Sequence, residues 1–253
     1  MNDQVHLSRA EISTAIHGAA ETIVVTFESV FQRIERIAEA MILLHQDQVQ
    51  RGESLTSERL AALRPVIQEQ LRQLPFVDGM GVLVAPDLLA DCARCVEWWR
   101  QREHDVAPLW VNLDPTSVDL YDYLDMEWFV AAQRDLSRAV VGPYIDYAGA
   151  DHYIVTLVSP VVDGVFLGAV GADIWMSAIE AKVIPALYEL NFEAVLVNSE
   201  RRVVSTNSSR WTVGSRLAAI PRAGDGTFAA AVDVGGASNW VLAAAIETTT
   251  ATA

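Results

Sequence analysis

Aromatic and carboxylate side chains alternate in the middle of the chain, and they are the residues best placed to do chemistry. A first cluster runs from Tyr121 to Phe129, Tyr144 and Asp146 follow it, and Asp173 comes last. Few cations in this stretch offset the carboxylates. Ring faces and an anion both stabilise an ammonium group, so an aromatic box that ends in a carboxylate can hold a small cation. The pattern therefore predicts a binding site for a cationic ligand.

The sequence lacks the motifs of common enzyme classes. It has no Gly-x-Ser-x-Gly elbow, no phosphate-binding P-loop, no HExxH zinc motif and no dinucleotide fingerprint. Asp122 and Asp125 could act as general acid and base, but nothing beside them supplies an electrophile. We predict a protein that is not an enzyme and uses no cofactor. A small-molecule enzyme acting on an amine or its derivative stays open as an alternative.

The charge of the chain excludes several partners. With 18 basic and 33 acidic residues among 253, the net charge is −15 and the pI is about 4.6. Such a chain repels phosphate backbones and anionic membrane surfaces, so we expect neither nucleic-acid nor membrane binding. The N-terminus has no basic run followed by an apolar core, and no apolar stretch approaches the ~20 residues that span a bilayer. These features predict a cytoplasmic protein.

The only two cysteines form a Cys-x-x-Cys motif, Cys92 and Cys95. This motif can be half of a zinc site or a redox pair. A zinc site needs two more ligands, and the five histidines are scattered along the chain. We therefore predict no metal site and expect two thiols on a short helix beside Trp98 and Trp99.

A long helix is predicted near the N-terminus. Ser8 and Glu11 form a capping box. Apolar residues then recur with steps of three and four, at Ile12, Ile16, Ala19, Ile23, Phe27, Val30, Ile34, Ile37 and Met41. This heptad-like seam favours a homodimer helix, and a spine helix packed along its own domain is the alternative. A second helix is expected from Ser57, with Pro65 kinking or restarting it.

The middle and the end of the chain change to strand patterns. We expect strands at 78–86 and 108–114, and a hairpin of 153–162 and 165–173 around the turn Asp163-Gly164. Helical spacing returns from Ile174 to Leu190, where Pro185 should break the helix. A smaller set of strands follows, at 192–198, 202–205, 228–234 and 240–246.

Several short motifs in this order resemble the ligand-binding module of Cache sensor domains, which are PAS-like receptors for amino acids, amines and organic acids. They are Trp128-Phe129-Val130-Ala131-Ala132, Pro143-Tyr144-Ile145-Asp146, and the Pro-Val hairpin that closes with Gly168-Ala169-Val170-Gly171-Ala172-Asp173. The strands after residue 190, with Val213-Gly214-Ser215-Arg216-Leu217, resemble the smaller second module of double-Cache sensors. The resemblance implies an α+β fold, in which a long N-terminal helix precedes two PAS-like antiparallel-sheet modules.

The resemblance also implies roles for single residues. In amino-acid-binding members, an Arg two residues before the Trp holds the ligand carboxylate, and the last Asp holds the ammonium. The Arg position is Met126 here, and the Asp position is Asp173. A thioether cannot give a carboxylate the charge-assisted hydrogen bonds of a guanidinium, so the ligand implied is a biogenic amine or polyamine. The implied ligand-binding residues are Tyr121, Met126, Trp128, Phe129, Tyr144, Asp146 and Asp173.

These expectations combine into one organisation. Residues 1–74 form an N-terminal helical region, 75–190 the larger ligand-binding module, 191–247 the smaller module, and 248–253 a disordered tail. We predict a Cache-type sensor for a small cationic amine that signals through a partner, transcriptional or otherwise, or through a change in a homodimer joined by the N-terminal helix. An amino-acid-binding Cache protein and an interaction scaffold remain alternatives. Asp173 acting only as a helix N-cap is the structural alternative for that residue.

Overall fold

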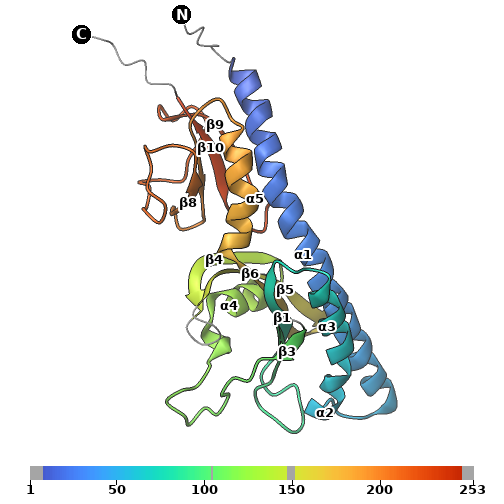
Figure 1. The fold of residues 1–253 in the computed structure, drawn as a ribbon. Coiled ribbons are helices and arrows are strands. Elements are labelled where there is room, and N and C mark those ends of the chain that lie inside the picture. The colour runs from blue at the N-terminus through green and yellow to red at the C-terminus, as the bar shows by residue number, and fades with distance from the viewer. Residues whose placement is uncertain (1–7, 104, 147–151, 247–253) are drawn as a thin grey trace, which may run out of the picture. The chain divides into compact units, whose positions relative to one another are not determined.

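The computed structural model describes residues 8–103, 105–146 and 152–246 (Figure 1). The chain forms two compact units. The larger unit is Phe27–Ala178, and the smaller unit combines Met1–Thr26 with Ile179–Ala253. The tail predicted to be disordered, 248–253, lies outside the described residues. Among the described helices, none is long and apolar enough to span a membrane.

The predicted long helix is α1, Arg9–Arg51. Its capping box forms as the sequence indicates, because Ser8 Oγ accepts a hydrogen bond from the Glu11 amide while the Ser8 amide and hydroxyl both donate to the Glu11 carboxylate. The helix is 43 residues long, about ten residues beyond the last residue of the apolar seam.

The apolar seam of α1 is buried within the chain. Every seam residue from Ile16 to Met41 is at most 8% exposed. Arg138 anchors the helix further, because its guanidinium pairs with Glu35 and Glu28 and lies over the ring of Phe31. The seam is therefore filled by the protein's own core, as in a spine helix, and it offers no dimer face.

A second helical segment follows α1 and is divided at the predicted proline. It consists of α2 (Ser57–Leu60), the 3₁₀ turn η1 (Ala61–Leu63) and α3 (Arg64–Arg72). Pro65 lies in the first turn of α3, where a missing amide hydrogen does not matter. The apolar side chains of Ile67 and Leu71 are buried, and α3 packs against the strands β1 and β2.

The larger unit contains a six-stranded antiparallel sheet in the order β3-β2-β1-β6-β5-β4. Its strands are β1 (Val77–Val84), β2 (Val96–Gln101), β3 (Val106–Pro108), β4 (Ala139–Asp146), β5 (His152–Asp163) and β6 (Val165–Trp175). The hairpin predicted around Asp163 and Gly164 is β5–β6. Helix α4 (Glu127–Asp135), preceded by the 3₁₀ turn η2 (Tyr123–Asp125), packs on β4, β5 and β6.

The strand expected at 108–114 is wrong beyond its first residue. β3 ends at Pro108, and the last ladder bond runs from the Leu109 amide to the Trp98 carbonyl. Side chains then satisfy the backbone locally, because Asn112 Oδ1 accepts from the Asp114 amide and Asp114 Oδ1 accepts from the Thr116 amide. Such turns compete with strand pairing.

The short helix expected around the two cysteines is also wrong. Cys92 and Cys95 lie in the connection that precedes β2, and Trp98 and Trp99 belong to that strand. Backbone hydrogen bonds close the connection, including one from the Val84 amide to the Cys95 carbonyl.

The smaller unit has a four-stranded antiparallel sheet in the order β8-β7-β10-β9. Its strands are β7 (Ala194–Val197), β8 (Val203–Thr206), β9 (Phe228–Asp233) and β10 (Val241–Ala245). Helix α5 (Met176–Tyr188) precedes them and continues through Pro185, contrary to the prediction. Its buried residues Ile179, Val183 and Leu187 recur every four positions, and this packing holds the helix together despite the proline.

Candidate ligand-binding site

One face of the larger sheet carries a cavity, and the alternation of side chains along the strands explains its lining. Residues two apart on a strand share a face. Val96 and Trp98 therefore point the same way from β2, and Gly171 and Asp173 do so from β6. The cavity has about 450 Å³ free of protein atoms, counting the part open to solvent.

Residues outside the strands complete the lining. Trp128 comes from α4, and Leu109, Val111 and Tyr121 come from the segment between β3 and η2. All these elements belong to the larger unit. The full lining is Leu83, Val96, Trp98, Leu109, Val111, Tyr121, Trp128, Tyr144, Asp146, Thr156, Gly171 and Asp173.

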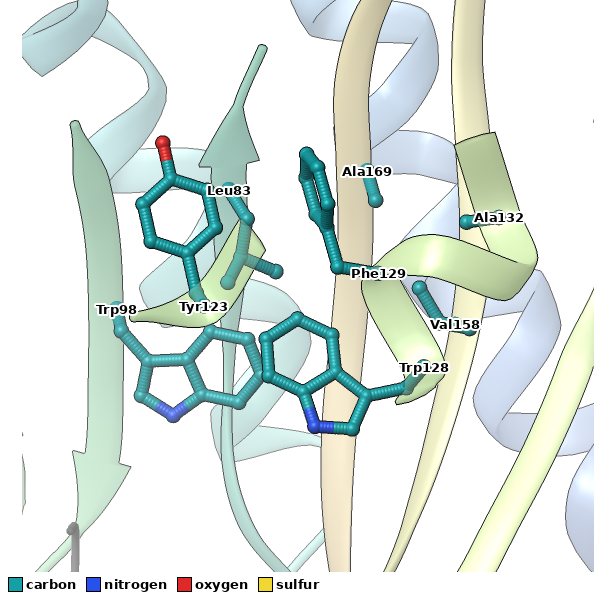
Figure 2. Packing of buried hydrophobic residues seen from close by; sticks show 8 residues of the cluster. All are labelled: Leu83, Trp98, Tyr123, Trp128, Phe129, Ala132, Val158 and Ala169. Atoms are coloured by element: carbon teal, nitrogen blue, oxygen red, sulfur yellow. The ribbon is translucent and has the colours of Figure 1, made fainter. Parts of the chain in front are cut away.

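Trp98 lies over a row of glycines. A Cβ atom built on Gly79 would be 2.6 Å from Trp98 Nε1, and one on Gly171 would be 3.4 Å from its ring. Gly81 pairs with Trp98 on β2 and with Gly171 on β6. Only residues without side chains leave room for the indole to cross these strands. Figure 2 shows Trp98 from β2 and Trp128 from α4 directed toward each other, and both line the cavity.

Asp173 lies within β6, two residues before the strand ends, and takes part in a short hydrogen-bonded chain. Thr156 Oγ1, directly opposite on β5, donates to Asp173 Oδ1 at 2.6 Å. The Tyr144 hydroxyl is 2.6 Å from the same Thr156 oxygen. Because the Thr156 proton is directed at Asp173, Tyr144 is the donor of this second bond. Asp173 is a strand residue and not a helix N-cap, which removes the structural alternative.

Burial dominates the electrostatics of the cavity. It raises the pKa of Asp173 to about 8, with Thr156 opposing the shift and the negative charge of Asp146 adding to it. Burial likewise raises the pKa of Tyr121 and Tyr144, and the nearby charge of Asp173 raises both further. Both phenols are therefore neutral at physiological pH.

The cation that acts on Asp173 is already engaged. Arg100 makes a bidentate ion pair with Asp78, with distances of 3.0 and 2.8 Å, and both side chains are buried. Asp78 and Arg100 act on Asp173 with opposite signs. The pair is close to neutral as a unit, so it does not cancel the negative charge of the cavity.

The structure brings five of the seven predicted site residues to this cavity and leaves two outside its lining. Tyr121, Trp128, Tyr144, Asp146 and Asp173 line it. The other two, Met126 and Phe129, belong to the aromatic core around Trp128. Phe129 is 1% exposed and contacts Tyr123 and Phe166 edge to face, and Met126 packs against that core just before α4.

Three lining residues that matter were missed in the sequence. They are Trp98, Thr156 and Gly171. Gly171 could have been found, because it precedes Asp173 by two positions and must share its face. Thr156 could have been found from the hairpin register, which places it opposite Asp173.

The remaining carboxylates near Tyr121 face elsewhere. Asp125 and Glu127 are exposed, and Asp122 pairs with Arg94 at 2.8 Å. Among the described residues, no cluster of His, Cys, Asp or Glu could hold a metal ion. Burial raises the pKa of the Cys95 thiol to about 12, which makes it a poor nucleophile.

Comparison with known proteins identifies solved structures that share this fold. No protein-family model matches the sequence, and no curated protein matches it. Methyl-accepting chemotaxis protein X matches with a TM-score of 0.61 over 93% of this chain and 97% of that chain, at 13% identity. The periplasmic sensory domain of the Campylobacter jejuni chemoreceptor Tlp1 matches with a TM-score of 0.60 over 90% and 91%, at 11% identity.

A third structure carries a ligand. The ligand-binding domain of the Pseudomonas fluorescens chemoreceptor CtaA, in complex with L-isoleucine, matches with a TM-score of 0.60 over 95% of this chain and 92% of that chain, at 14% identity. The predicted α+β fold is confirmed: a long N-terminal helix precedes antiparallel sheets, as in the Cache-like sensor domains among these structures.

Proposed function

We propose that this chain is a sensor module that binds a small organic cation, a biogenic amine or a polyamine, in the cavity of the larger unit. Of the solved structures that share its fold, one is described as the periplasmic sensory domain of a chemoreceptor and another as the ligand-binding domain of a chemoreceptor. None of those compared above is described as an enzyme, so the fold supports a binding role. The chemistry of the cavity supports the choice of ligand.

The observation that carries the proposal is the charge of the lining. Asp146 and Asp173 are its acidic residues, and none of the described lining residues is Arg, Lys or His. Trp98, Trp128 and two tyrosines supply ring faces around them. Carboxylates beside aromatic rings stabilise an ammonium group through both Coulomb attraction and cation–π contacts.

An α-amino acid is the second candidate, because CtaA was solved in complex with L-serine and with L-isoleucine. Its ammonium could pair with Asp173, but its carboxylate would need a cationic partner. The described lining offers none, and Met126 occupies the position where the resemblance places an arginine. Burying an unpaired carboxylate is costly, so this cavity favours ligands without one.

We further propose that ligand binding is passed on through a partner protein, a signalling or transcriptional component. The seam of α1 is buried in the protomer and does not supply the contact for a second copy. Any change on binding must therefore be presented on another surface.

A thermal-shift screen tests the ligand class. It compares monoamines, diamines and polyamines with α-amino acids and dicarboxylates of similar size. An amine at 100 times its dissociation constant should add about 2.7 kcal/mol of apparent stability. Stabilisation confined to α-amino acids or dicarboxylates would contradict the proposal.

Asp173→Asn tests the site. Removing one partner of a buried charge pair typically costs ~3–5 kcal/mol, so amine affinity should fall by about two decades or more. Asp125→Asn is the matched control, because it makes the same change of side chain, carboxyl to amide, on an exposed residue outside the lining. Equal amine affinities for both variants would place the binding site elsewhere.

A further inference from the structure

We infer that this site exchanges a proton for its cation: Asp173 is protonated until a cation enters, and it releases that proton to solvent as the cation binds. The inference rests on the proposed function, because it describes how the same cavity accepts an ammonium group. It adds a pH dependence that cation binding alone does not require.

The hydrogen bonds of Asp173 are few for a buried carboxylate. Thr156 donates one bond of 2.6 Å to Oδ1, and Thr156 in turn receives one from Tyr144. An ionised carboxylate in a protein interior needs several donors or a cation to offset lost hydration. One hydroxyl is too little, so a carboxylate here is stabilised either by a proton or by an external cation.

The charged groups around Asp173 lead to the same conclusion. Asp146 on β4 lines the cavity with it and is negative, and Asp78 on β1 is negative as well. Arg100 on β2 is the cation that acts on Asp173, and it is bound to Asp78 through two hydrogen bonds. His152 on β5 contacts the ion pair itself: its Nδ1 accepts a hydrogen bond from Trp175 and lies 3.4 Å from Arg100 and 3.7 Å from Asp78.

The tyrosines do not alter this balance. Tyr121 and Tyr144 also line the cavity, and burial raises the pKa of each, so both stay neutral. Two carboxylates in one cavity cannot both be ionised without cost, and the arginine that acts on Asp173 is bound to Asp78. Geometry thus explains why the pKa of Asp173 rises to about 8.

The exchange conserves charge in the cavity. The O–H bond of the Asp173 carboxyl breaks, its proton passes to buffer, and the carboxylate pairs with the incoming ammonium. Below pH 8 the observed affinity for the cation then rises about tenfold with each unit of pH, and above pH 8 it levels off. A sensor built this way responds to amines more strongly in alkaline than in acidic surroundings.

Calorimetric titration with 1,4-diaminobutane tests the exchange directly. The titration is repeated at pH 7 and pH 8.5, each in two buffers with different heats of ionisation. We expect about 0.9 proton released per ligand at pH 7 and about 0.25 at pH 8.5, with about eightfold tighter binding at the higher pH. Binding without proton release would overturn the exchange and leave cation binding intact.

Thr156 supplies a sharper variant, because its hydroxyl lowers the pKa of Asp173. Thr156→Val keeps the shape of the side chain and removes the donor, so the pH midpoint should move up. The affinity ratio between pH 8.5 and pH 7 should then rise toward about 30-fold, the limit for one proton. Thr156→Ser keeps the hydroxyl and should restore the wild-type profile. An unchanged profile in Thr156→Val counts against the inference.

Melting temperatures without ligand separate this inference from the proposed function. A carboxyl whose pKa is higher in the folded than in the unfolded state binds its proton more tightly when folded. It therefore makes the wild type lose stability as pH rises from about 4 to about 8. Asp173→Asn should lack that part of the slope. If no amine binds, the proposed function fails, but these melts still show whether Asp173 holds a proton. Parallel profiles of melting temperature against pH for wild type and Asp173→Asn would refute the inference that Asp173 holds a proton.

Discussion

Single residues decide what this cavity can bind. Met126, at the position of the ligand-binding arginine in the resemblance, packs against the aromatic core and leaves the lining without a cation. Asp173, the other residue to which the resemblance gives a role, does line the cavity, and it lies on strand β6 opposite Thr156. The proposed binding chemistry therefore rests on one type of contact, carboxylate to ammonium, and on aromatic faces.

Tyr121 tests the aromatic contribution at the residue scale. Tyr121→Leu removes a ring face from the lining and should weaken amine binding by about 0.5–2 kcal/mol, roughly 2- to 30-fold. Tyr121→Phe keeps the ring and should bind within about twofold of wild type, since the neutral hydroxyl is not required for a cation–π contact. Calorimetric titration with the best amine measures both. Equal losses in the two variants would assign the effect to the hydroxyl instead.

Elements set the positions of these residues, and the sheet does so through its glycines. Gly79 on β1 and Gly171 on β6 leave space for the indole of Trp98, and Gly81 pairs with Gly171 and lies against the backbone of β2. A Cβ atom at Gly81 would be 2.1 Å from the Glu97 carbonyl oxygen, which is too close for any side chain. The strands could not keep their pairing around such an atom.

Matched glycine substitutions test this packing. Gly81→Ala should lower the free energy of unfolding by about 1–3 kcal/mol or more, because β1 and β2 must separate. Gly18→Ala is the control: it lies in α1 with nothing within 4 Å of a Cβ atom, and it should stabilise by about 0.5–1 kcal/mol. Urea unfolding midpoints give both values. A tolerated Gly81→Ala would mean that the strands can shift.

The sequence predicted elements well where one physical signal dominated. The capping box and apolar seam identified α1, and the Asp163-Gly164 turn identified β5–β6. It failed where local signals compete with packing. β2 has no clean alternation of apolar and polar residues, so Trp98 was not assigned to the cavity. Helix α5 continues through Pro185 because its buried face holds it.

The candidate site shows the same division. Carboxylates and aromatics signal their chemistry by type, so five of the seven predicted residues meet at the cavity. Thr156 and Gly171 have no such signal: the strand register places Thr156 opposite Asp173, and the two-residue spacing along β6 places Gly171 on the same face. The ligand and the cytoplasmic location stay predictions, since neither depends on the fold.

At the scale of the whole molecule, α1 is shared between the two units. Its residues up to Thr26 belong to the smaller unit and those from Phe27 to the larger one. The seam is buried on both sides of that boundary, at Ile23 and Phe27 for example. The helix is therefore a structural component of each unit, and its apolar face serves internal packing.

Ile34 distinguishes internal packing from dimer packing. It is fully buried, so Ile34→Ala should lower the free energy of unfolding by about 2–5 kcal/mol. Leu43→Ala, on the same helix but 66% exposed, should change it by no more than about 0.5 kcal/mol. Urea unfolding gives the stabilities, and light scattering should give the same mass for wild type and both variants. A drop in mass for Ile34→Ala alone would instead support the interpretation of the seam as a dimer contact.

The placement of Trp98 and Trp128 beside Asp173 also has an optical consequence. Both indoles line the cavity, where the local electric field changes when a proton leaves and an ammonium arrives. Indole emission shifts with the field along the ring, so occupancy should alter the intrinsic fluorescence of the protein. The chain thus contains its own reporter, and binding can be followed in the light it emits without attaching any label.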